Sequence, residues 1–151
     1  MPGVVLDTGP LVAYLYPPDT YHDWAVEQFS ALDLPFVTCE PVITEACFLL
    51  ARNRLPPARV LEAMERGVVR IDFQLAEEAA LVRQSIERYA NVPMSLADAC
   101  LVRLADMTGL PICTLDSDFA IYRTRRGRAL NLISPAGRHS LHEPYRKGEW
   151  R

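Results

Sequence analysis

Short apolar runs alternate along the chain with longer segments in which apolar residues recur every three or four positions. A short apolar run between turn-forming residues is typical of a buried strand, and the longer period is typical of a helix. The runs predict strands at 4–7, 36–38, 68–72, 112–115 and 129–133. The longer segments predict helices at 21–32, 41–53, 57–66, 75–90 and 95–108.

Proline and glycine agree with these boundaries. Pro41 and Pro57 suit the first turn of a helix, and Gly109 and Pro111 separate the last predicted helix from the next strand. Thr8-Gly9-Pro10 predicts a turn that leads from the first strand into its helix. Strands separated by helices of this length predict an α/β fold, in which a central parallel sheet of about five strands is covered by helices on both faces.

Length and composition fit one domain. The 151 residues, half of them hydrophobic, can form a single sizeable core. We expect this domain over residues 1–134 and a polar, locally basic extension over 135–151, packed loosely or disordered. No apolar run approaches the ~18 residues of a membrane span, and no signal-peptide pattern precedes the first strand. We therefore expect a cytoplasmic protein with no membrane partner.

Cysteines and net charge narrow the function classes. The four cysteines show no C-x-x-C spacing, so they indicate buried, reduced thiols and neither a zinc site nor a thioredoxin-like motif. A formal net charge of −3 excludes a bulk polycation that binds nucleic acid by overall charge. Fifteen of the sixteen basic residues are arginine, whose planar fork suits phosphate, although a solvated turn explains a local cluster equally well. That cluster is Arg123, Arg125, Arg126 and Arg128.

Four carboxylates occupy unexpected positions. Glu45 and Asp98 have mainly apolar neighbours three and four positions away on their predicted helices, so both belong to inward-facing sides. Asp7 and Asp116 each end a predicted strand. The carboxyl ends of parallel strands meet at one edge of the sheet, and the helices that return the chain begin at that same edge. The four carboxylates can therefore converge.

Each position also has a structural explanation. Ser95-Leu-Ala-Asp98 has the spacing of a capping box, Asp7 fits a turn or cap, and Asp116 fits a cap of the following helix or turn. Nothing local explains Glu45. Because isolated buried carboxylates are costly, a shared site is a better explanation than four separate accidents.

Carboxylates without histidine or cysteine nearby favour Mg²⁺ or Mn²⁺, which can activate water and stabilise charge on a phosphodiester. Asp118 is a fifth candidate ligand. Competing chemistries fit less well. An aspartic protease needs two Asp-Thr-Gly loops in an all-β fold, and this chain has one such loop among helices. A haloacid-dehalogenase-like phosphatase needs an acidic residue where this chain has Gly9. A receiver domain needs a lysine late in the fold, and the only lysine, Lys147, lies in the tail.

These residues resemble the motifs of PIN-domain ribonucleases, most closely the VapC-type toxins of toxin–antitoxin pairs. The resemblance covers about residues 3–134: VVLDTGPLVAYL with Asp7, VITEACFLL with Glu45, MSLADACLVRLA with Asp98, and Thr114-Leu-Asp116-Ser-Asp118-Phe119. It implies a three-layer, Rossmann-like domain and Mg²⁺- or Mn²⁺-dependent RNA cleavage that leaves a 5′-phosphate and a 3′-hydroxyl. It also implies a homodimer and a cognate antitoxin.

The resemblance assigns roles to these residues. Asp7, Glu45, Asp98 and Asp116 are expected to be catalytic, with Asp7, Asp98, Asp116 and Asp118 as metal ligands. Thr8 and Thr114 are expected to orient ligands or contact phosphate, although bonding to nearby backbone explains their hydroxyls equally well. Arg123, Arg125 and Arg126 are expected to hold the RNA backbone, because they follow the Asp116–Asp118 turn. A housekeeping RNA-processing nuclease without an antitoxin and an inactive PIN-like binding module are the alternatives.

Overall fold

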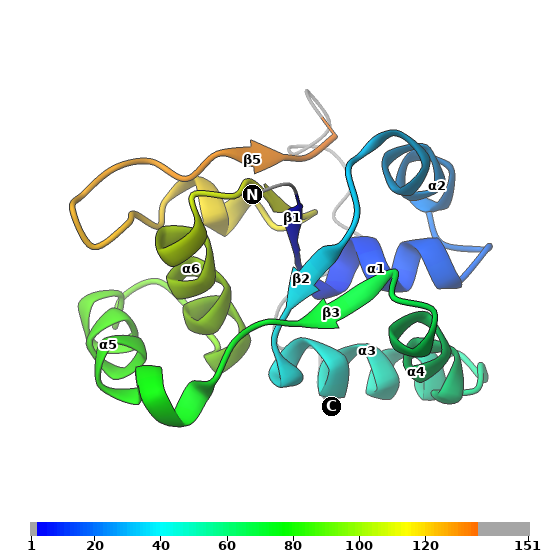
Figure 1. The fold of residues 1–151 in the computed structure, drawn as a ribbon, viewed down its shortest axis with the longest axis horizontal. Helices are drawn as coiled ribbons and strands as arrows, with labels where there is room; N and C mark the ends of the chain where they lie inside the picture. Colours follow the sequence, from blue (N-terminus) through cyan, green and yellow to red (C-terminus); the bar gives the residue numbers. More distant parts are fainter. Residues whose placement is uncertain (1–2, 136–151) are drawn as a thin grey trace.

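The structure, a computed structural model, describes residues 3–135 as an α/β domain (Figure 1). Five strands are present in this part of the chain: β1 (Val4–Leu6), β2 (Phe36–Thr38), β3 (Val69–Ile71), β4 (Ile112–Cys113) and β5 (Leu132–Ile133). The α-helices are α1 (Thr8–Leu15), α2 (His22–Ala31), α3 (Glu40–Arg52), α4 (Ala58–Glu65), α5 (Leu75–Arg88) and α6 (Leu96–Thr108). A short 3₁₀ helix, η1 (Ser117–Ala120), follows β4.

All strand pairs in the sheet are parallel, in the order β3-β2-β1-β4-β5. The central strand β1 pairs with β2 on one side and with β4 on the other. The chain therefore leaves β1, β2 and β4 at one edge of the sheet, which is the edge where open α/β sheets bind ligands. The predicted parallel α/β architecture is confirmed.

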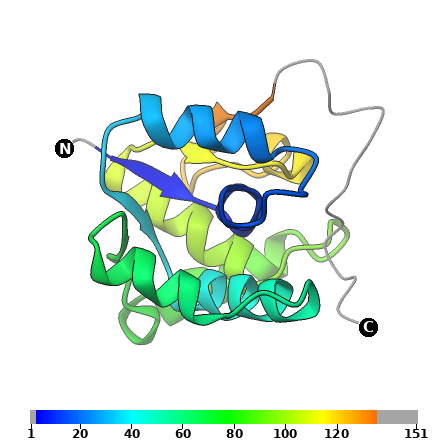
Figure 2. The same cartoon turned by 90° about the vertical axis from the view of Figure 1, so that its right-hand side faces the viewer.

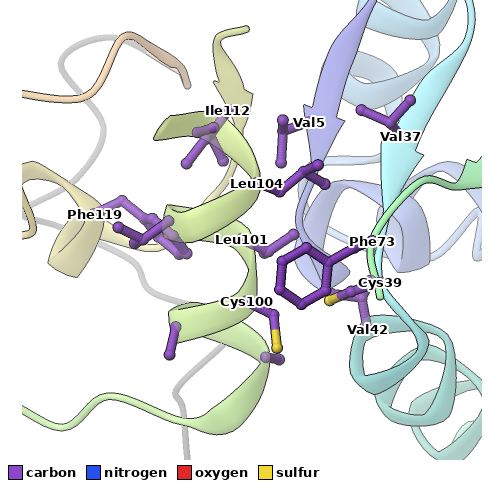
Figure 3. Packing of buried hydrophobic residues seen from close by; sticks show 14 of the residues in the cluster. Val5, Val37, Cys39, Val42, Phe73, Cys100, Leu101, Leu104, Ile112 and Phe119 are labelled. Atoms are coloured by element: carbon purple, nitrogen blue, oxygen red, sulfur yellow. The ribbon is translucent and has the colours of Figure 1, made fainter. Parts of the chain in front are cut away.

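Alternate residues of the strands pack into two hydrophobic layers. Val5 of β1 faces the cluster built around α6, whereas Val4 and Leu6 face the cluster built from α1, α3 and α4. Figure 1 shows α5 and α6 on one side of the sheet and α1 to α4 on the other. Figure 3 shows side chains from α6, β1 and the segment after β3 packed together in the first cluster.

Most predicted elements are present, with shorter ends. The exception is Thr8-Gly9-Pro10, predicted as a turn, which forms the first turn of α1. The prediction was wrong because Asp7 already acts as the N-cap, and the N–H groups of a first helical turn have no partner within the helix, so Pro10 loses no hydrogen bond there. Figure 2 shows the tip of β1 directed at the start of this helix.

The cysteines, the absence of a predicted membrane span and the C-terminal extension were also subjects of prediction. All four cysteines are free thiols; Cys39, Cys100 and Cys113 are buried, and Cys47 is half-buried. Across residues 3–135, no helix is both long and apolar enough to cross a membrane. Apart from Pro135, the predicted extension over 135–151 lies outside the described residues, and the boundary near residue 134 stays a prediction.

Candidate active site

Asp7 lies where β1 ends and α1 begins, and its side chain is 4% exposed. Its Oδ1 accepts a hydrogen bond from the Thr8 N–H at 2.8 Å, which caps the helix. Its Oδ2 accepts a hydrogen bond from the Thr114 hydroxyl at 2.7 Å. Because Thr114 directly follows β4, this bond ties together the ends of two neighbouring strands.

Glu45 projects from the second turn of α3 and is 8% exposed. Its Oε2 accepts a hydrogen bond from the Thr8 hydroxyl at 3.0 Å. The buried carboxylate that nothing in its own helix explained therefore has a partner at the start of α1. Through Thr8, Glu45 is linked to the residue next to Asp7.

Asp98 occupies the first turn of α6 and is 3% exposed. Its Oδ2 accepts a hydrogen bond from the Ser95 N–H at 2.7 Å, and its own N–H donates to Ser95 Oγ at 3.1 Å. The predicted capping box is therefore present. It does not remove Asp98 from the site, because the cap itself places this carboxylate at the edge where Asp7 lies.

Asp116 and Asp118 follow β4 and are half-buried. The Asp116 N–H donates to the Thr114 hydroxyl at 2.9 Å, and Asp116 Oδ1 accepts from the Asp118 N–H at 2.9 Å to cap η1. The second carboxylate oxygen of Asp116, Oδ2, is buried. Thr114 therefore joins Asp7 and Asp116 through one hydroxyl, donating to the first and accepting from the second.

The pKa of Asp7 shows how close these charges lie. Burial raises its pKa from 3.8 to about 8, and the negative charges of Asp98 and Asp116 add to the increase. The hydrogen bonds from Thr114 and Thr8 act in the opposite direction and lower the pKa. Three acidic residues from separate segments therefore interact electrostatically at one edge of the sheet. The N-terminal ends of α1, α3, α6 and η1 also lie there, and their partial positive charge favours carboxylates.

The donor chemistry fits a hard divalent cation, since the buried acidic and hydroxyl side chains of the site carry only oxygen donors. As placed, however, no group of three or more His, Cys, Asp or Glu side chains within residues 3–135 could hold a metal ion. Hydrogen bonds to caps and hydroxyls already orient Asp7, Asp98 and Asp116. The residues would therefore hold a cation only after their side chains turn toward a common point.

The two predicted site threonines are buried, with Thr8 0% and Thr114 1% exposed. Both hydroxyls donate to carboxylates, Thr8 to Glu45 and Thr114 to Asp7, and their role in orienting metal ligands stays a prediction. Their contact with phosphate stays a prediction. Sequence reasoning missed a third hydroxyl, that of Thr38, which donates to the Leu6 carbonyl at 2.8 Å and fixes the end of β1. A polar residue at the tip of a buried strand, as at Thr114, was the available signal.

The arginine cluster does not converge on the carboxylates. Arg125, Arg126 and Arg128 line a cavity with Asp106 and Gly109 at the C-terminal end of α6, whereas Asp98 is in its first turn. Their nearness in sequence to the Asp116–Asp118 turn was misleading because the chain returns to the other edge before it enters β5. Arg123 donates to the carbonyls of Ala120, Ile121 and Tyr122, so its guanidinium stabilises the end of η1.

Comparison with known proteins identifies the family of the chain. Residues 4–124 match the PIN domain family, and the chain belongs to that family. The structure is similar to the crystal structure of VapC20 from Mycobacterium tuberculosis, described as a sarcin–ricin loop cleaving toxin, with a TM-score of 0.66 and 22% sequence identity. The match covers 78% of this chain and 93% of that chain. A comparison with curated protein sequences gave no match.

Proposed function

We propose that this protein is a metal-dependent endoribonuclease and the toxin of a toxin–antitoxin pair. The observation that carries the proposal is a group of four acidic residues, three of them buried, that separate segments bring to the carboxyl edge of a PIN-domain sheet. A cation bound there would offset the mutual repulsion of these carboxylates and favour their charged forms. The similarity to VapC20, a sarcin–ricin loop cleaving toxin, supports the proposal.

Asp7, Asp98 and Asp116 would hold Mg²⁺ or Mn²⁺, with Asp118 as a further ligand and Glu45 bonded through Thr8. When bound, such an ion supplies an activated water and neutralises the charge that develops on the phosphodiester. The hydrogen bonds of the chain keep these carboxylates at one edge of the sheet, from which they would turn toward the cation. Thr114 holds Asp7 and Asp116 in register, and the Ser95 cap holds Asp98 at the start of α6. Burial raises the pKa of Asp7. A neighbouring cation would lower this pKa and favour the charged form of the carboxylate.

The proposed class implies partners. We expect a homodimer in the cytoplasm and a small antitoxin that blocks the acidic edge. The genomic position of the gene separates this toxin from a housekeeping RNA-processing nuclease, because a toxin gene has a short antitoxin reading frame directly beside it. A nuclease-active protein without such a neighbour would support the housekeeping alternative.

The direct test is RNA cleavage by the purified protein with Mg²⁺ or Mn²⁺. We expect Asp7→Asn and Asp98→Asn each to abolish cleavage of a looped RNA, since the amide removes a charged ligand with little change of shape. Glu62→Gln, on the exposed part of α4, is the matched control and should cleave like the wild type. Far-ultraviolet circular dichroism checks that all variants are folded. Unchanged cleavage by both aspartate variants would refute the site, and a wild type without cleavage would support the inactive binding module.

A further inference from the structure

A second site lies at the edge of the sheet opposite the carboxylates. A cavity of about 470 Å³ opens there between the C-terminal end of α6 and the loop that leads into β5. Its lining contains four arginines, Arg103, Arg125, Arg126 and Arg128, but a single acidic residue, Asp106. A smaller hollow of about 190 Å³ shares Arg103, Asp106 and Arg125 with this cavity and is also lined by Arg88 from α5. The basic surface is therefore continuous from one hollow to the other.

The loop that carries these arginines is held in one conformation. The Gly127 N–H donates to the Thr124 carbonyl at 2.9 Å, and the Thr124 N–H donates to the Arg128 carbonyl at 2.8 Å. Gly127 has φ +81°, a left-handed conformation that glycine adopts without strain. Arg125 and Arg126 therefore occupy the tip of a tight hairpin turn. Such a turn fixes the backbone at both positions, so the ordering cost on binding falls on the two side chains alone.

Asp106 anchors this turn to α6 and is itself occupied. Its Oδ2 accepts a hydrogen bond from the Arg125 N–H at 3.0 Å and lies 3.7 Å from Arg103 NH1. Arg103 is also paired with Glu78 at 2.7 Å. The guanidinium groups of Arg125, Arg126 and Arg128, by contrast, make no ion pair or hydrogen bond with any residue from 3 to 135. Three exposed cations on a fixed loop are thus available to a ligand.

We propose that this cavity binds the phosphate backbone of the RNA substrate at a distance from the cleavage site. The proposal rests on the proposed nuclease function. The carboxylate edge repels phosphate and the whole chain carries a net charge of −3, so the energy of RNA binding must come from a local cationic surface. Arginine forks match phosphate oxygens in a bidentate manner.

The separation of the two sites indicates the size of the substrate. Asp98 and Gly109 lie eleven residues apart along α6, which corresponds to about 16 Å at 1.5 Å per residue. This distance is several times the spacing between successive phosphates of a strand, so the cavity would take phosphates several nucleotides from the cut. A structured RNA can reach both sites, whereas a very short oligonucleotide cannot.

The test compares two triple variants of the full chain with the same change of charge. Arg125→Ala/Arg126→Ala/Arg128→Ala removes the cavity arginines, and Arg54→Ala/Arg59→Ala/Arg66→Ala removes three exposed arginines of the α3–α4 region. Binding of a fluorescein-labelled hairpin RNA is followed by anisotropy in EDTA, where divalent cations are removed. We expect the cavity variant to bind about tenfold more weakly, with a salt dependence less steep by about 2 in log–log slope. Equal weakening in both variants would overturn the proposal, because it would reflect net charge alone.

Cleavage provides a second readout that separates this inference from the nuclease proposal. With Mg²⁺ or Mn²⁺, the cavity variant should raise KM for the hairpin, leave kcat unchanged, and leave cleavage of a trinucleotide unaffected. A loss of kcat on both substrates would overturn the proposal.

If the wild type binds hairpin RNA through these arginines but does not cleave it, the nuclease proposal fails and the binding site stands. If the cavity variant loses binding of poly-glutamate but not of RNA, the cavity binds an acidic protein segment and the RNA proposal is refuted. Thermal unfolding confirms that both variants are folded.

Discussion

Each site carboxylate has two oxygens, and this explains why capping and a role in an acidic site are compatible. Asp98 uses Oδ2 to cap α6, and Asp116 uses Oδ1 to cap η1. Asp7 caps α1 with Oδ1 and accepts from Thr114 with Oδ2. The capping explanations that competed with the functional one are thus all correct. They orient the carboxylates, and the proposed metal would use charge that the caps leave incompletely neutralised.

The pKa of Asp7 predicts how stability depends on pH. The folded-state pKa of about 8 lies above the ordinary aspartate value of 3.8, so the folded protein retains a proton that the unfolded chain has lost between these pH values. Stability of the metal-free protein should therefore fall as pH rises from about 4 to about 8. Asp7→Asn has no such proton, and we expect it to be more stable than the wild type by about 1–3 kcal/mol at pH 8.

Urea unfolding in EDTA at several pH values measures this difference. The advantage of Asp7→Asn should shrink toward acidic pH, where the wild-type carboxyl is protonated in both states. Glu62→Gln, a substitution at an exposed position of α4, again serves as the control. A constant difference between Asp7→Asn and the wild type at every pH would contradict the raised pKa.

The Thr114 hydroxyl links the segments that carry Asp7 and Asp116, and removing this hydroxyl should affect both segments. Thr114→Val leaves the Asp116 N–H and one oxygen of Asp7 without this partner. We expect a loss of about 1–3 kcal/mol in the free energy of unfolding, together with slower RNA cleavage. Thr114→Ser retains the hydroxyl and should restore most of both. Equal behaviour of the two variants in unfolding and cleavage assays would rule out the hydroxyl as the cause.

Among the secondary-structure elements, helix starts dominate the site. β1 ends where α1 begins, β4 is followed by η1, and α6 begins where its capping box holds Asp98. Each of these helix starts contributes at least one acidic side chain and the partial positive charge of its free N–H groups. The acidic edge is therefore partly balanced by backbone dipoles before any cation binds.

The capping box at α6 can be separated from the function of Asp98. Ser95→Ala removes the oxygen that accepts from the Asp98 N–H but keeps the Ser95 backbone N–H that holds the Asp98 carboxylate. We expect this variant to lose about 1 kcal/mol of stability and to keep most of its cleavage activity. Asp98→Asn should show the reverse, near-normal stability with no cleavage. Denaturant unfolding and RNA cleavage assays of both variants test whether capping and catalysis are separable. A loss of both stability and activity in Ser95→Ala would show that they are not.

In the whole molecule, the two hydrophobic clusters share one sheet and should unfold together. Leu101 of α6 and Leu50 of α3 are fully buried on opposite faces. We expect Leu101→Ala and Leu50→Ala each to lower the free energy of unfolding by about 2–5 kcal/mol, in a single transition followed by both fluorescence and circular dichroism. Two separate transitions in either variant would show that the faces fold independently. Met107→Ala, an exposed site on α6, should change little.

The pattern of residues determined the order of strands and helices, the parallel sheet, and the four acidic positions near its carboxyl edge. Local chemistry carried this information, because apolar period, proline and glycine act over a few residues. The hydroxyl of Thr8 could be named from the sequence, but its bond to Glu45 joins residues that are 37 positions apart. The bond between Thr114 and Asp7 spans 107 positions.

Only the tertiary structure decided which distant groups meet. It placed Arg125, Arg126 and Arg128 at the far end of α6, although they are close in sequence to Asp116, because a parallel strand must be entered from the opposite edge. It also raised the pKa of Asp7, since burial and the charges of Asp98 and Asp116 arise only when the sheet assembles. The sequence by itself determined which acidic residues are available; the packing of the parallel sheet decided which of them share an electrostatic environment.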